Sequence, residues 1–195
     1  YEISECLVGS EMCIRDRRRI ESHMKEILRK MAGQLTTGKG GDAGLADGEP
    51  PLRSLLEELD TELKQGEKSA YEDMENKLLT ETRYYLRYMN MRRTQAFVLG
   101  RIEGELKHLG ELPSQAQPIA ELMERISGGF HEYNNAVGLL EALDAVKEAM
   151  REQPLPELRE EFENRAVLFQ ILLELEQFLE IKKEFVEELL SLIHI

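Results

Sequence analysis

The sequence predicts an all-α fold, an antiparallel bundle of about five helices, and three observations favour it. Apolar residues recur every three or four positions through most of the 195 residues, which is the spacing of amphipathic helices. No segment has to be interpreted as a β-strand. The connections after residue 109 are short, which is typical of antiparallel neighbours in a bundle.

The first expected helix carries one apolar stripe, and a glycine-rich segment follows it. The stripe runs from Ile20 to Leu35. Residues 36–51 are rich in glycine and have no apolar periodicity, so we interpret them as a flexible linker. They lack the Lys-Ser/Thr pair that a phosphate-binding loop requires.

One very long helix is expected next, because an apolar stripe extends from Leu52 to Leu106. As a single rod over residues 52–109 it would be about 87 Å long at the usual helical rise. The closing helix, residues 157–188, would be only about 48 Å long by the same rise. A chain of this size cannot bury so long a rod, so we expect a bend or break near Gly66.

Three shorter helices complete the expected bundle. They cover residues 114–126, 137–150 and 157–188, with turns at Gly110 and at Gln153. Four apolar residues of the last helix are expected to face the long helix: Phe162, Phe169, Leu172 and Leu179.

The composition excludes several classes of function. The net charge of −13 opposes binding to nucleic acid, and the absence of tryptophan leaves little surface for stacking bases. No run of about 18 apolar residues is present, so we expect no membrane span within this chain and a soluble fragment.

The motifs of catalysis and metal binding are almost absent. Glu-x-x-His occurs once, at Glu105 and His108, whereas a di-iron bundle needs it twice. A ferritin-like metal-binding bundle is therefore only a remote alternative. No serine lies in a nucleophile-elbow pattern. We expect neither an enzyme nor a cofactor nor a metal site.

Three segments resemble one family. PLPELREEFENRAVLFQILLELEQFLEIKK (154–183), RYYLRYMNMRRTQ (83–95) and FHEYNNAVGLLEAL (130–143) are similar to the C-terminal domain of the putative aromatic acid exporter family of Gram-positive bacteria. The resemblance spans roughly residues 18–188. It implies a cytoplasmic accessory or regulatory domain of a bacterial membrane protein, whose partner would be its own transmembrane domain, encoded before residue 18.

The two ends resemble translated sequencing-adapter reads rather than native protein. We therefore expect residues 1–17 and 191–195 to be foreign and the helical domain to occupy residues 18–190. Both cysteines, Cys6 and Cys13, lie in the first segment. Without them the domain has no disulfide and no thiol nucleophile.

Arginines and tyrosines near the start of the second motif suggest a site for a small anionic aromatic ligand. Arginine forks suit carboxylates, and tyrosine rings would flank an aromatic ring. The candidate ligand-binding residues are Arg83, Arg87, Arg92, Tyr84 and Tyr88. The alternative is structural, with the arginines paired to Glu160, Glu161 or Glu163 of the last helix.

Other polar residues lie close to the apolar stripes and are expected to form hydrogen bonds and ion pairs that hold the helices in register. They are Asn76, Gln95, His131, Tyr133, Asn134, Glu163, Asn164, Arg165 and Gln170. A second class of function stays open at this point: a helical module for homo-oligomerisation or protein interaction, with no ligand.

Overall fold

The computed structural model describes residues 11–37, 50–74, 79–129 and 136–193. Within these ranges the chain is helical, without a strand, so the all-α prediction is confirmed. The helices are α1 (Glu11–Thr37), α2 (Leu52–Met74), α3 (Leu79–Leu106), α4 (Ala116–Gly128), α5 (Val137–Arg151) and α6 (Arg159–Ile193).

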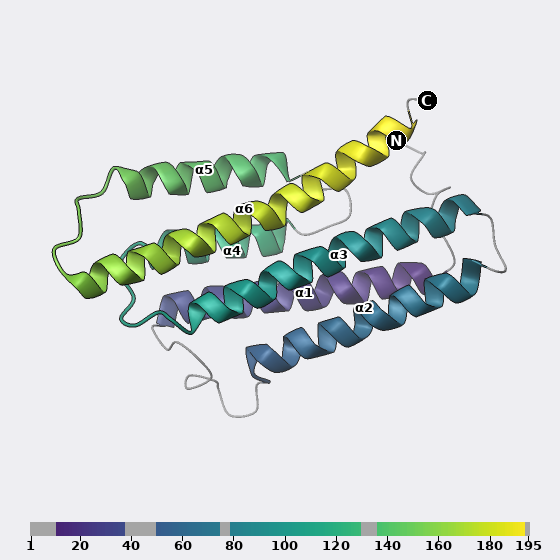
Figure 1. The fold of residues 1–195 in the computed structure, drawn as a ribbon, viewed down its shortest axis with the longest axis horizontal. Helices are drawn as coiled ribbons and strands as arrows, with labels where there is room; N and C mark the ends of the chain where they lie inside the picture. The colour runs from purple at the N-terminus through teal and green to yellow at the C-terminus, as the bar shows by residue number, and fades with distance from the viewer. Residues whose placement is uncertain (1–10, 38–49, 75–78, 130–135, 194–195) are drawn as a thin grey trace.

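The helices run along one long axis, and each is antiparallel to the next in the chain (Figure 1). α1 packs against α2, α3 and α4, while α3 lies between α2 and α6. α5 packs on α6 and α4. The start of α1 and the end of α6 lie at the same end of the bundle, at the right in Figure 1.

The apolar stripe of α1 forms part of the core, as expected. Ile20, Met24, Ile27 and Leu28 are at most 1% exposed. The helix begins at Glu11, earlier than the boundary at Arg18 expected from the sequence. Residues 11–17 therefore take part in α1, and their foreign origin stays a prediction.

The long apolar segment is divided, but not at Gly66. α2 continues through Gly66 to Met74 and α3 begins at Leu79, which corrects the predicted position of the break. A Cβ on Gly66 would lie 2.0 Å from Met89 Cε and 3.3 Å from Tyr85 Oη. The glycine thus allows close packing of α3 on α2, and this tertiary contact outweighs its weak helix propensity.

The last helix contributes fewer core residues than expected. Leu172 and Leu179 are buried and Phe169 is partly buried, but Phe162 is 62% exposed. The expectation for Phe162 was wrong because the buried Asn164 faces the bundle at this end of α6. Two residues along a helix are about 200° apart, so Phe162 points to the opposite side.

Candidate functional site

The inner side of α3 carries a buried arginine with three polar partners. Arg92 is 1% exposed. Its Nε donates to Tyr88 Oη at 3.0 Å, its Nη1 to Gln95 Oε1 at 2.9 Å, and its Nη2 to Glu21 Oε1 at 2.8 Å. Because a buried charge is costly unless paired and hydrogen-bonded, these bonds are what allows a guanidinium to lie in the core.

The partners of Arg92 connect three helices. Tyr88 Oη donates to Glu21 Oε1 of α1 at 2.9 Å, and Gln95 Nε2 donates to the backbone oxygen of Phe178 in α6 at 2.8 Å. Burial raises the pKa of Tyr88, so its phenol remains a neutral donor. We call Glu21, Tyr88, Arg92 and Gln95 the Arg92 network.

An aromatic cluster adjoins this network. The ring centroids of Tyr84 and Tyr88 are 6.5 Å apart, and Phe185 of α6 lies 6.0 Å from Tyr84 and 6.2 Å from Tyr88. The guanidinium of Arg17 is 5.9 Å from both tyrosine rings, within cation–π range. The cluster therefore joins α1, α3 and α6 through both charge and packing.

The structure does not bring the five candidate ligand-binding residues into one site. Tyr88 and Arg92 are buried together, and Tyr84 is partly buried beside them. Arg83 and Arg87 are exposed. Their role in ligand binding stays a prediction.

The expected structural pairs of Arg92 were the wrong ones. Arg92 pairs with Glu21 of α1, whereas Glu161 pairs with Arg165 and Glu163 pairs with Arg159 within α6. Sequence reasoning missed Glu21 because the glutamate sits at the edge of the α1 stripe, where a solvated position and a buried ion pair look alike.

Asn164 joins α6 to the connection after α3. Its Oδ1 accepts from the backbone N–H of Gly110 and its Nδ2 donates to the backbone oxygen of Glu111, both at 3.0 Å. Such a bond pair satisfies backbone groups that a loop would otherwise leave unpaired.

The other predicted polar residues have more local partners or cannot be placed. Gln170 Nε2 donates to Glu174 Oε1 at 3.0 Å, and Arg165 Nη1 donates to the backbone oxygen of Pro154 at 2.6 Å. The exposed pair of Arg159 and Glu163 is one helical turn apart. Four residues lie outside the described residues: Asn76, His131, Tyr133 and Asn134.

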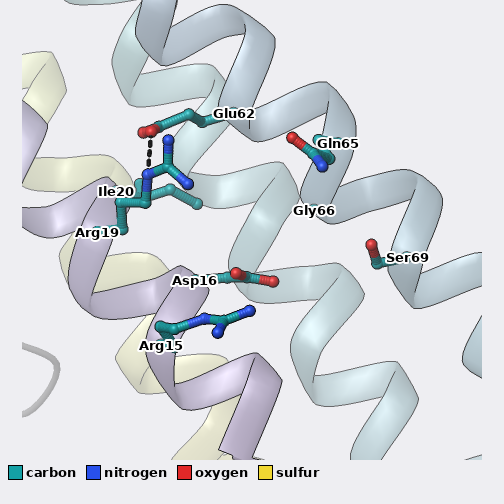
Figure 2. A pocket seen from close by; sticks show the side chains of 8 residues that line it. All are labelled: Arg15, Asp16, Arg19, Ile20, Glu62, Gln65, Gly66 and Ser69. Carbon is teal, nitrogen blue, oxygen red and sulfur yellow. Dashed lines mark ion pairs between the residues drawn. The ribbon is translucent and has the colours of Figure 1, made fainter.

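A small pocket opens between α1 and α2, and Figure 2 shows its side chains: Arg15, Asp16, Arg19, Ile20, Glu62, Gln65, Gly66 and Ser69. Arg19 forms an ion pair with Glu62 there. Charges of both signs line the pocket. Its volume is about 100 Å³, well below the roughly 300–1,000 Å³ of typical ligand pockets.

A larger hollow, which we call the α2–α3 groove, lies between the outer sides of these two helices. Its volume is about 730 Å³. The lining residues are Arg53, Leu56, Glu57, Asp60, Thr61 and Leu63 of α2, with Arg93, Ala96, Phe97, Gly100 and Arg101 of α3.

Two further searches cover only the part of the chain that the structure describes. It contains no group of three or more His, Cys, Asp or Glu residues arranged to hold a metal ion. His108, from the single Glu-x-x-His, is exposed. None of the described helices is long and apolar enough to cross a membrane.

Comparison with known sequences identifies the family. Residues 11–183 match the sequence model of a family described as "Putative aromatic acid exporter C-terminal domain". The chain belongs to this family.

One relative and one solved structure show the same relationship. The uncharacterized protein YqjA of Bacillus subtilis (strain 168) is 31% identical over 169 residues, which are 87% of this chain and 50% of the relative. The chain thus spans about half the length of that relative. A crystal structure of a putative membrane protein from Clostridium difficile 630 has a TM-score of 0.74 at 27% identity, covering 89% of this chain and 98% of the other.

Proposed function

We propose that this chain is the cytoplasmic accessory domain of a membrane exporter and that it regulates transport without catalysing a reaction. The observation that carries the proposal is the family match over residues 11–183. The relative YqjA is twice as long as the segment it shares with this chain, which leaves room for a membrane domain there.

The position of the chain ends supports a connection through one end of the bundle. α1 begins and α6 ends at that end (Figure 1), so a preceding membrane domain would attach where α1 starts. Arg18 and Arg19 are exposed in this part of α1. Basic residues near a membrane span favour the cytoplasmic side.

The Arg92 network supports a route for regulation. It connects α1, the helix that would continue from the membrane domain, with α3 and α6 through Glu21 and Gln95. A displacement of α1 would change the contacts of a buried ion pair, and such elements have discrete arrangements rather than a continuum. The proposed ligand is a small anionic aromatic compound, following the description of the family.

The sidedness can be tested in the full-length relative YqjA with two reporters fused to its C-terminus. A fluorescent protein that folds in the cytoplasm should be bright, and an alkaline phosphatase that needs export should be inactive. The opposite pair of results would contradict the proposal.

Regulation can be tested by deleting from YqjA the segment that matches this chain over 169 residues. Export of benzoate-like acids from loaded cells should change in rate while the remaining protein still inserts into the membrane. An unchanged rate at equal membrane abundance would contradict a regulatory role.

A further inference from the structure

The α2–α3 groove lies on the outer surface of the bundle and has an exposed aromatic ring within it. Phe97 is 69% exposed, more than any other phenylalanine whose burial the structure describes. The guanidinium of Arg101 lies 5.5 Å from its ring centroid. Phe97 adjoins the apolar residues Leu56, Leu63 and Ala96 in the lining of the groove, and an apolar patch with a polar rim is typical of an interaction surface.

A glycine in the same groove has no packing role within its own chain. A Cβ added to Gly100 would meet no atom within 4 Å. Gly66, by contrast, makes room for Met89. The absence of a side chain at Gly100 keeps this part of the groove open.

The two sides of the groove differ in charge. α3 contributes the basic residues Arg93 and Arg101 around Phe97, while α2 contributes the acidic residues Glu57 and Asp60 beside one basic residue, Arg53. The side chains of Arg93, Glu57 and Asp60 are each more than half exposed. Their ion pairs within the chain are worth little at such exposure, so these three residues can exchange partners readily. Arg101 is 39% exposed and keeps its ion pair with the buried Glu174 of α6.

We propose that the α2–α3 groove is a self-association surface, occupied by the same groove of a second copy of this chain. The charge pattern is self-complementary, as an isologous two-fold interface requires. In it, α3 of each copy lies over α2 of the other. Phe97 then enters the partner's groove. Arg101 keeps its pair with Glu174 of its own chain and faces the partner's Glu57.

The direction of the two-fold axis follows from the heights of these residues, meaning their positions along the long axis of the bundle. Arg53 pairs with Glu103 and Arg93 with Glu67, which sets the alignment of antiparallel α2 and α3. Glu57 therefore lies near the height of Arg101. An axis parallel to the helices keeps these heights and opposes unlike charges.

An axis perpendicular to the helices is unfavourable. It would set α3 against the partner's α3 and bring Arg93 close to the partner's Arg101. The parallel axis also leaves both α1 helices starting at the same end. Two chains anchored in one membrane would need both α1 helices to start at the same end. That requirement rests on the proposed function, whereas the self-association itself does not.

The test is sedimentation velocity of the chain across the micromolar range, with a reducing agent because Cys6 and Cys13 could cross-link. The wild type should shift from the 22.5 kDa monomer towards twice that mass as its concentration rises. Phe97→Glu should raise the dissociation constant at least about 30-fold, the scale of an interface hot spot. Phe162→Glu is the matched control, because Phe162 is 62% exposed on α6, and it should leave the dissociation constant unchanged.

Charge reversal tests the orientation. Glu57→Arg should weaken self-association, because it sets two arginines against each other across the interface, and Glu57→Gln should weaken it less, with helical content unchanged by circular dichroism in both variants. Arg101 is left in place because it also pairs with the buried Glu174. A monomeric wild type, a dimer that survives Phe97→Glu, or a dimer lost in Phe162→Glu would overturn the proposal. Equal dissociation constants for the wild type and Glu57→Arg would overturn the parallel arrangement.

Discussion

Arg92 and Arg93 are neighbours in the sequence but belong to different environments. Arg92 is 1% exposed and bonds Glu21, Tyr88 and Gln95 on the inner side of α3. The side chain of Arg93 is 54% exposed and contacts both carboxylate oxygens of Glu67 on the outer side. One helical step, about 100°, separates a structural ion pair from an exchangeable one.

The difference shows that residue type alone does not assign a role to an arginine. The free-energy cost of removing one partner of an ion pair depends on the environment of the partner that remains. A buried partner is left without its counter-charge, whereas an exposed partner is solvated by water.

Arg92→Met should cost about 3–5 kcal/mol of unfolding free energy, because Glu21 would remain largely buried without its counter-charge. Arg93→Met should change it by less than about 0.5 kcal/mol, as surface substitutions usually do. Urea denaturation measures both. Adding Glu21→Gln to Arg92→Met should recover part of the loss, and equal losses in the two arginine variants would contradict the comparison.

Tyr88→Phe should cost about 1–3 kcal/mol, because it removes the hydroxyl that bonds both Glu21 and Arg92. Burial raises the pKa of Tyr88 above the value of about 10 that a tyrosine has in an unfolded chain. The neutral Tyr88 hydroxyl therefore contributes its full stabilisation of the folded state below about pH 10. That stabilisation is lost as the pH rises through the pKa of the folded state.

The wild type should therefore lose stability above about pH 10 more steeply than Tyr88→Phe, measured by denaturation at successive pH values. Tyr71→Phe provides the control, because Tyr71 is 62% exposed. Tyr71→Phe should lose stability above about pH 10 as steeply as the wild type. Equal pH profiles for the wild type and Tyr88→Phe would contradict a buried neutral phenol.

The smallest expected effect compares two glycines. Gly66→Ala should lose about 1 kcal/mol, because its Cβ would displace the buried Met89 side chain. Gly100→Ala should gain about 0.5–1 kcal/mol, because the position is open and alanine favours the helix. Unfolding free energies measured at dilute protein concentration separate the change in fold stability from any effect on self-association. Changes of the same sign in the two variants would contradict the contrast.

The sequence predicted the fold class and most of the core because helix periodicity is local. The stripe of α1 from Ile20 to Leu35 and the buried Leu172 and Leu179 of α6 follow from three- and four-residue spacing alone. The break in the long helix was misplaced at Gly66. Glycine lowers helix propensity locally, but the contact with Met89 that explains this glycine comes from another helix.

The candidate site was predictable only in part. Tyr88, Arg92 and Gln95 stand out as polar residues near an apolar stripe, yet their partner Glu21 lies 71 residues away from Arg92. Periodicity shows which side of a helix is apolar but not which helix covers it. The sequence therefore offered Arg83, Arg87 and Arg92 as one set, and the structure separates them by burial.

By itself, the sequence determined that this chain is helical, acidic and related to one family, since periodicity, charge and motif similarity are properties of residues in order. Only the tertiary structure decided which arginine is buried, which glycine is packed and where Phe97 is exposed. Those properties depend on the rotation of each helix about its axis and on which neighbour covers it. Both are set by packing between residues distant in the chain.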